Sequence, residues 1–203
     1  MNKLIILFLV GTLMSKAMCA QSAYEEEVEL FRKKYLNDLL TEPRQPIKPE
    51  QAAALRFFLP DENFKIYAEI LLLDNTDTIY FTTVTGVLKT YTKYALAEFF
   101  IDTIACQLTI YQSPALKIKQ GLENYLFLPF NDLTNGNETY EVGRYIDFTI
   151  EELAEEMLII DFNKAYNPYC AYSDGFACPI PPKENMLNAS INAGEKKPNL
   201  KRH

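Results

Sequence analysis

The residues of this 203-residue chain that could do chemistry gather within residues 143–185. Three carboxylates in this segment, Asp147, Asp161 and Glu184, could bring two acids close together, as glycoside hydrolysis requires. Acidic residues at strand ends and in proline-rich loops more often cap backbone amides or pair with a cation. Arg144 is the obvious partner, because its planar guanidinium suits a bidentate contact with a carboxylate. We therefore expect a structural ion pair, and a carboxylate-based acid/base hydrolase is the alternative.

The same segment is rich in amides and aromatic rings. Its asparagines could recognise a ligand, or they could satisfy the backbone of an irregular loop that cannot bond to itself. Its tyrosines could stack on a sugar or a peptide, or they could form an aromatic lid over a sheet end. The candidate ligand-binding set is Arg144, Tyr145, Asp147, Asp161, Asn163, Tyr166, Asn167, Glu184 and Asn185. The expected ligand is an unidentified small polar molecule or a glycan fragment.

Seven residues separate Cys170 from Cys178 in a proline-framed loop. Behind a secretion signal, the default interpretation of such a pair is a disulfide. Closing so short a loop would stabilise the fold by roughly 2.5 kcal/mol. A metal site is a weaker interpretation, because Zn²⁺ requires four ligands at closer paired spacing. A reactive thiol is also weaker, because no histidine or lysine is obviously placed to form a thiolate. We expect a disulfide and no metal.

The single histidine, His203, is the last residue of the chain. This position excludes a Ser-His-Asp or Cys-His catalytic group and any histidine cage for a metal, unless the end folds back. Glycine-rich phosphate loops are absent, so the sequence indicates no nucleotide and no other cofactor. The formal net charge of −7 disfavours nucleic acid and anionic membrane surfaces as partners.

Residues 1–20 have the three-part layout of a secretory signal peptide: a short basic start, an apolar stretch at 4–14 and a region of small residues. The apolar stretch is shorter than the roughly 20 residues that a membrane-spanning helix needs. We expect cleavage near Cys19 or Ala20 and a secreted or periplasmic protein. Lipid attachment to Cys19 is the alternative.

Hydrophobic periodicity predicts how these residues are positioned. Tyr24, Val28, Phe31, Tyr35 and Leu39 recur at steps of three and four, which indicates an amphipathic helix within residues 21–42. A proline-rich linker with one short helix follows at 43–63. We expect a β domain at 64–195 and a disordered basic tail at 196–203.

The β domain shows the alternation that is typical of strands. Short polar connections join successive strands, as hairpins require. We predict strands at 65–73, 78–85, 88–94, 96–101, 104–111, 125–130, 140–148 and 158–162. The expected fold class is mainly β, an antiparallel meander forming a sandwich or barrel-like sheet, with one N-terminal amphipathic helix. Residues 161–185 should fold over one end of this sheet.

Four stretches carry a resemblance to a known family: LFLPFNDLTNG (126–136), GRYIDF (143–148), the run from Ile160 to Asn185, and the closing AGEK (193–196). They resemble a bacterial family of domains of unknown function, number 1684, and the opening LLTEPRQPI is similar to the secreted form of that family. The resemblance covers essentially all of the mature chain. It implies no activity, because the family has none established.

We take a binding module for a small polar ligand or a glycan fragment as the leading functional hypothesis. The alternatives are the carboxylate-based hydrolase described above and a structural envelope protein without a ligand.

Overall fold

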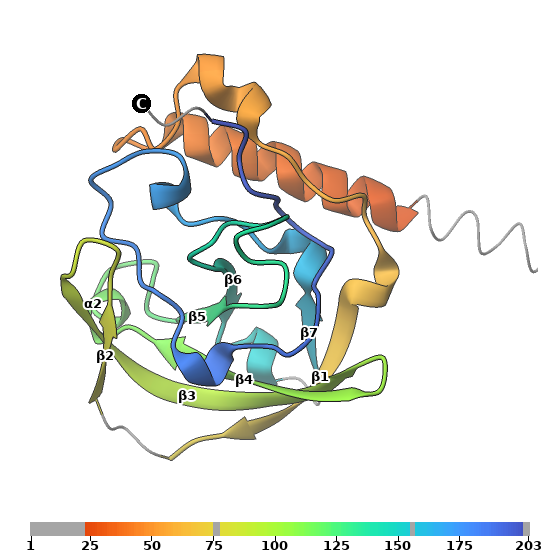
Figure 1. Ribbon diagram of the computed structural model, residues 1–203. Helices are drawn as coiled ribbons and strands as arrows, with labels where there is room; N and C mark the ends of the chain where they lie inside the picture. The colour runs from red at the N-terminus through yellow and green to blue at the C-terminus, as the bar shows by residue number, and fades with distance from the viewer. Residues whose placement is uncertain (1–22, 75–77, 155–156, 201–203) are drawn as a thin grey trace, which may run out of the picture.

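A computed structural model describes residues 23–74, 78–154 and 157–200 (Figure 1). The predicted signal peptide, residues 1–20, lies outside these ranges. Within them, no helix is long and apolar enough to cross a membrane.

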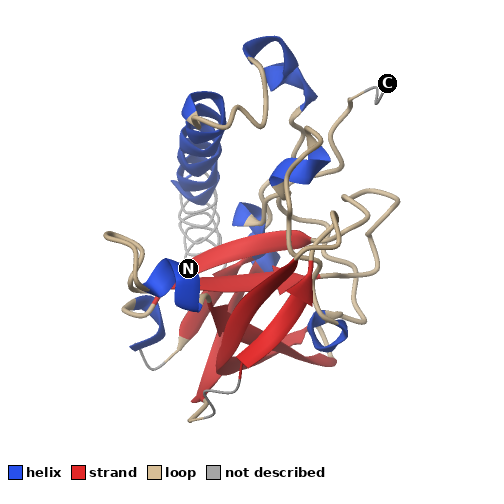
Figure 2. Ribbon diagram, turned by 90° about the vertical axis from the view of Figure 1, so that its left-hand side faces the viewer, coloured by secondary structure: helices blue, strands red, loops and turns tan. Residues whose placement is uncertain are grey.

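Seven strands form one antiparallel sheet that curls into a half-barrel (Figures 1 and 2). The strands are β1 (Lys65–Leu72), β2 (Thr78–Thr82), β3 (Leu88–Ile101), β4 (Ile104–Gln112), β5 (Tyr125–Phe130), β6 (Arg144–Thr149) and β7 (Leu158–Asp161). Their order is β6-β5-β4-β3-β1-β7, and β2 pairs with β3. The predicted fold class, mainly β and antiparallel with one N-terminal helix, is confirmed. Between the strands lie a short α-helix, α2 (Pro114–Lys117), and 3₁₀ turns that include η1 (Pro49–Ala54), η3 (Glu152–Ala154) and η4 (Phe162–Lys164).

β3 is one long strand where the sequence predicted two. Its pairing with β4 shifts by one residue between Lys93 and Ala95, which marks a β-bulge. Because side chains alternate between the two faces of a strand, the extra residue reverses which face the odd-numbered positions occupy. Tyr91 therefore packs in a cluster on one face of the sheet, and Ala95 packs in the main core on the other.

The sheet consequently has apolar side chains on both faces. The main core fills the inside of the half-barrel, with Leu108, Leu128 and Ile160 fully buried. The second cluster is aromatic and consists of Phe81, Tyr91, Tyr111, Phe127 and Tyr145. Its rings form a continuous series with centroid separations of 4.6 Å (Phe81 to Tyr91), 5.5 Å (Tyr91 to Phe127) and 4.7 Å (Phe127 to Tyr145).

The N-terminal helix, described over residues 23–41, lies alongside the curled sheet (Figure 2). Tyr24, Val28 and Leu39 on the predicted apolar face are at most 4% exposed. Arg32 fixes the helix to the following segment, because its Nη2 donates to the carbonyl oxygen of Phe58 at 2.9 Å. The helix is thus held by its apolar face and by one buried cation.

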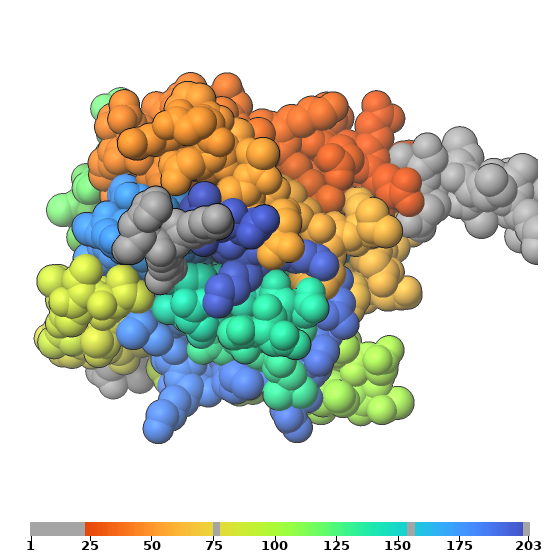
Figure 3. Space-filling view, turned by 45° about the horizontal axis from the view of Figure 1, so that its top comes forward, coloured from red at the N-terminus to blue at the C-terminus, as the bar shows by residue number. Residues whose placement is uncertain are grey.

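The C-terminal segment runs across the top of the half-barrel between the N-terminal residues and the loop around residue 138 (Figure 3). Backbone hydrogen bonds hold this segment in place. The amide of Lys196 donates to the carbonyl oxygen of Arg56 at 2.8 Å, and the amide of Lys197 donates to the carbonyl oxygen of Glu138 at 3.0 Å. Residues 196–199 are therefore part of the fold, although their charge led us to expect a disordered tail. Residues 201–203 lie outside the described ranges.

Arg144, on β6, holds this C-terminal segment in place through contacts with Ile191 and Ala193. Its side chain is fully buried, and Nη2 lies 2.9 Å from Asp132 Oδ2 and 2.9 Å from the carbonyl oxygen of Ile191, while Nη1 donates to the carbonyl oxygen of Ala193. The predicted ion pairs of Arg144 with Asp147, Asp161 or Glu184 are wrong. Register explains the difference: Phe130 pairs with Arg144 across β5 and β6, which places Asp132 close by.

The predicted disulfide is absent from the structure, in which Cys170 and Cys178 are buried thiols that are not joined to each other. The loop folds so that Cys178 Sγ accepts a hydrogen bond from the backbone amide of Cys170 at 3.3 Å. The two residues are therefore neighbours without a covalent bond.

Candidate functional site

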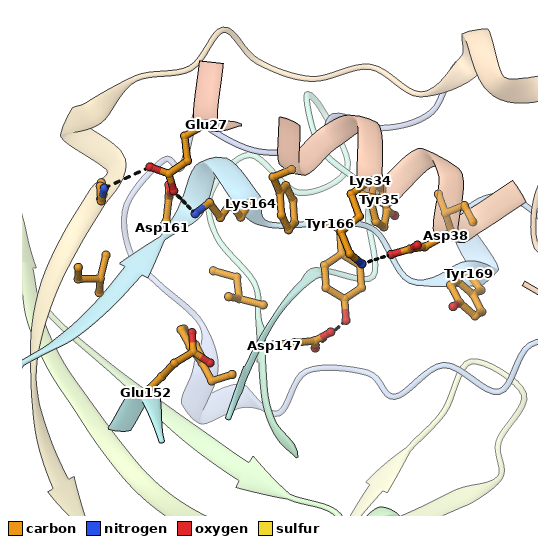
Figure 4. Close-up of a pocket in the computed structure, with 16 residues that line it drawn as sticks. Glu27, Lys34, Tyr35, Asp38, Asp147, Glu152, Asp161, Lys164, Tyr166 and Tyr169 are labelled. Atoms are coloured by element: carbon orange, nitrogen blue, oxygen red, sulfur yellow. Dashed lines mark hydrogen bonds and ion pairs between the residues drawn. The ribbon is translucent and has the colours of Figure 1, made fainter. Parts of the chain in front are cut away.

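β6 and β7 are the two ends of the strand order, and the half-barrel is incompletely closed between them. Beyond β7, the chain pairs with β6 at Tyr166, whose backbone exchanges hydrogen bonds of 2.9 and 3.0 Å with that of Tyr145. Next to this bridge, the N-terminal helix covers both strand edges and leaves a cavity of about 620 Å³ (Figure 4). Ligand pockets typically measure roughly 300–1,000 Å³.

The cavity has an apolar floor and a charged rim. The helix and the two sheet edges contribute most of its apolar side chains: Phe31, Leu39, Ile146, Phe148 and Ile159. The polar and charged side chains in the lining are Glu27, Lys34, Tyr35, Asp38, Lys65, Asp147, Glu152, Asp161, Lys164, Tyr166 and Tyr169. The N-terminal helix, β6 and β7, which are far apart in the sequence, therefore all contribute to the lining of the cavity.

Every lysine of the rim lies near a carboxylate (Figure 4). Glu27 is 2.6 Å from Lys164 and 3.9 Å from Lys65, and Lys34 is 2.5 Å from Asp38. The cations of the rim are thus largely matched by acids of the chain itself.

Asp147 differs from these acids, because among the described residues no lysine or arginine lies within salt-bridge distance of it. Its Oδ1 accepts hydrogen bonds from the hydroxyls of Tyr125 and Tyr166, both at 2.7 Å, whereas no donor of the described residues contacts Oδ2. The Asp147 side chain is exposed and lines the cavity. Desolvation by the neighbouring protein atoms raises the pKa of Asp147 and outweighs the opposing effect of the hydrogen bonds from Tyr166 and Tyr125.

Both tyrosines that contact Asp147 remain hydrogen-bond donors. Burial, together with the nearby charge of Asp147, holds the pKa of Tyr125 and of Tyr166 well above the ordinary value. The carboxylate is therefore fixed in position by neutral groups that do not balance its charge.

Comparison with known proteins gives the family. A family described as "Protein of unknown function (DUF1684)" matches residues 50–196. The chain belongs to the DUF1684 family. It is similar to the solved solution structure of an uncharacterised protein from gene locus rrnAC0354 of Haloarcula marismortui, with 28% identity and a TM-score of 0.61. That similarity covers 92% of this chain and 96% of the other. No curated protein matches the sequence.

The range that matches the family model contains part of the cavity lining of this DUF1684 protein. Asp147, Tyr166 and the floor residues of β6 and β7 lie inside residues 50–196, while the helix that covers them lies before residue 50. The family part thus carries the carboxylate, and the N-terminal helix completes the cavity.

Only three of the residues predicted as ligand-binding line this cavity, namely Asp147, Asp161 and Tyr166. Asp161 is largely engaged within the fold. Its Oδ1 accepts from the hydroxyl of Tyr24 at 2.9 Å and from the amide of Asn163 at 3.0 Å, which caps η4, and Lys164 lies 3.6 Å from Oδ2.

The other predicted residues lie elsewhere. Arg144, Asn163, Asn167 and Asn185 are fully buried, and their side chains bond to the backbone of neighbouring segments. Asn185, for example, accepts from the amide of Thr109 and donates to its carbonyl oxygen, both at 2.8 Å, as a paired strand would. This is the backbone-satisfying role that the sequence left open. The buried Tyr145 hydroxyl donates to the carbonyl oxygen of Pro179.

Glu184 does not line this cavity. It lies 2.8 Å from Lys93 and accepts from the hydroxyl of Tyr111 at 2.7 Å. The predicted residues therefore do not converge on a single hollow.

Sequence reasoning missed the helix residues of the site and the carboxylate behind them. Tyr35 lines the cavity, and its hydroxyl donates to Glu195 Oε2 at 3.2 Å. Glu195 also accepts from the Tyr172 hydroxyl at 2.5 Å and from the Asn167 amide at 2.8 Å, and burial raises its pKa to about 7. The one available signal was the closing AGEK stretch, which marked Glu195 without a role.

Proposed function

We propose that this DUF1684 protein binds a small molecule in the cavity between its N-terminal helix and the edges of β6 and β7. One observation carries the proposal: an apolar floor surrounds a carboxylate, Asp147, that no cation of the described chain neutralises. An apolar surface with a few fixed polar groups is the usual construction of a ligand pocket.

The cavity is held open by contacts at separate points of the helix. Near its start, Glu27 is joined to Lys164 of the sheet side, and one turn further Arg32 bonds to the linker. Further along, Tyr35 bonds to Glu195. These contacts oppose collapse of the helix onto β7, so little reorganisation is needed before a ligand enters.

A cavity-filling substitution tests this proposal. Ile159 lies in the floor and is 42% exposed, and Tyr67 is its direct partner on β1 and is 60% exposed without lining the cavity. Ile159→Trp should place a bulky ring in the cavity and obstruct it, and Tyr67→Trp is the matched control on the same face. A fragment library containing saccharides, amines and small acids would be screened by ligand-observed NMR against the wild type and both variants.

Compounds that bind the wild type should lose binding in Ile159→Trp and keep it in Tyr67→Trp. Thermal melting of both variants shows whether each is folded. Absence of any bound compound, or binding that Ile159→Trp leaves intact, would refute the proposal.

A carboxylate-based hydrolase is the second candidate, because Asp147 and Asp161 line one cavity from opposite strand edges. The raised pKa of Asp147 suits a general acid. Asp161 is the weaker partner, since its contacts with Tyr24, Asn163 and Lys164 already occupy it. Hydrolysis of nitrophenyl glycosides or esters that disappears in Asp147→Asn would favour this candidate over simple binding.

We also propose that the protein acts outside the cytoplasm, secreted or periplasmic, and that Cys170 and Cys178 form a disulfide there. The layout of residues 1–20 and the 3.3 Å contact between the two cysteines support this. The mass of the protein recovered from the producing cell would show both the removal of a signal peptide and the oxidation.

A further inference from the structure

We propose that the cavity selects a cationic ligand, a small amine or guanidinium compound with an apolar body, whose cation contacts Asp147. This inference rests on the proposed function and adds the chemical class of the ligand.

The charges of the lining carry the first step. Among the residues that the structure describes, three lysines and five carboxylates line the cavity. Salt bridges within the chain occupy all three lysines, together with Glu27, Asp38 and Asp161. Asp147 and Glu152 have no such partner among the described residues, and Glu152 instead accepts from the backbone amide of Thr149 at 2.7 Å. An incoming anion would face this excess of negative charge, whereas a cation would balance it.

The geometry of Asp147 carries the second step. Both tyrosine hydroxyls donate to Oδ1, which leaves the lone pairs of Oδ2 without a donor from the described chain. The carboxylate is already immobilised by these two bonds, so a ligand would not have to order it on binding. A charge-assisted hydrogen bond to Oδ2 is the strongest contact available in this cavity.

The rings around Asp147 carry the third step. Tyr166 lies 5.6 Å from Tyr35 between ring centroids, and Phe31 stacks on Tyr35 at 6.4 Å. Phe31, Tyr35 and Tyr166 all line the cavity. The faces of aromatic rings attract ammonium and guanidinium groups. The apolar floor then accepts the hydrocarbon part of the same molecule.

Lys34 lines the cavity and could compete with a cationic ligand for Asp147. Its side chain is 76% exposed and is bound to Asp38 at 2.5 Å. If Lys34 instead neutralised Asp147 in solution, Lys34→Gln would increase affinity for the cationic probe.

Three compounds of similar shape separate charge from apolar contact: phenethylamine, 2-phenylethanol and 3-phenylpropanoate. Calorimetric or NMR titration of the wild-type protein should show the amine binding roughly 10- to 100-fold more tightly than the alcohol, as a charge-assisted hydrogen bond provides. The carboxylate should bind more weakly than the alcohol. This comparison requires no variant.

Asp147→Asn should reduce the affinity of the amine to that of the alcohol and leave the alcohol unaffected. Glu184→Gln is the matched control, because Glu184 also accepts a hydrogen bond from a tyrosine hydroxyl but lies outside the cavity. Both substitutions remove one carboxylate, so they change the net charge by the same amount. It should leave the affinity of all three compounds unchanged.

The outcomes distinguish the two proposals. If the alcohol, the carboxylate or a saccharide binds at least as tightly as the amine, or if Asp147→Asn leaves amine binding unchanged, the cationic assignment is overturned. The cavity then remains a binding site provided that Ile159→Trp abolishes binding. If none of the three compounds and no library compound binds, both proposals fail.

Discussion

Replacing Arg144 with alanine should destabilise the fold by about 3–5 kcal/mol, because it removes the cation that organises the C-terminal segment. The side chain is fully buried, pairs with Asp132 at 2.9 Å and bonds to the carbonyl oxygens of Ile191 and Ala193. It also lies 5.2 Å from the ring centroid of Phe130.

The magnitude follows from what the substitution leaves behind. Asp132 is 1% exposed, so its carboxylate would remain buried without a counter-charge. Breaking a buried pair from one side costs about 3–5 kcal/mol. Two carbonyl groups would also lose their donor. In a domain of this size, such a loss lowers the melting temperature by roughly 6–20 °C.

Urea unfolding followed by circular dichroism measures the effect. Arg44→Ala is the control, since Arg44 is 65% exposed and pairs with Glu42 at 2.8 Å, and a surface pair contributes about 0–1 kcal/mol. Asp132→Asn combined with Arg144→Met should recover part of the loss, because it removes both buried charges. A loss below about 1 kcal/mol for Arg144→Ala would show that this buried pair does not hold the segment in place.

Three further predictions concern other parts of the chain. Gly194→Ala should destabilise the fold by more than about 2 kcal/mol in urea unfolding, because φ is +73° and a Cβ would lie 2.5 and 2.7 Å from two backbone carbonyl oxygens. Gly175 also has a positive φ, +85°, but has open space around it, so Gly175→Ala should cost only about 1 kcal/mol. Equal losses in the two variants would contradict the steric argument. Burial raises the pKa of Glu195 from 4.5 to about 7, so the folded protein holds a proton that the unfolded chain releases at lower pH. The stabilisation is full below about pH 4.5 and is lost as the pH rises to about 7. Wild-type stability should therefore fall relative to Glu195→Gln by on the order of 3 kcal/mol across that window, and a difference that does not change with pH would disprove it. The hydrogen bond with Cys170 lowers the pKa of Cys178 to about 7, so mild oxidation should form a disulfide, seen as the loss of two hydrogen masses, and Cys170→Ser should abolish it; a reduced wild type after oxidation would count against the pairing.

The local features of the fold could be predicted from the sequence. The strand predicted at 125–130 has those bounds in the structure, and Tyr24, Val28 and Leu39 mark the buried face of the helix. Both depend on side-chain periodicity, which backbone geometry fixes over a few residues. Short polar connections likewise predicted the antiparallel neighbours.

Features that depend on register could not be predicted. Nothing in the alternating pattern of residues 88–101 shows that the chain continues as one strand through a bulge, because the bulge is defined by the partner strand. Arg144 was expected to pair with an acid of its own segment, and it pairs with Asp132 because β5 and β6 align Phe130 with Arg144.

The sequence alone determined that this DUF1684 protein is an antiparallel β fold with one amphipathic helix, and that Asp147 and Tyr166 were candidate binding residues. The tertiary structure decided that these two meet Phe31 and Tyr35 of the helix in one cavity. The physical reason is that periodicity reports which side of an element is apolar. It does not report which two strand edges remain unpaired, and the cavity lies where β6 and β7 leave the half-barrel open.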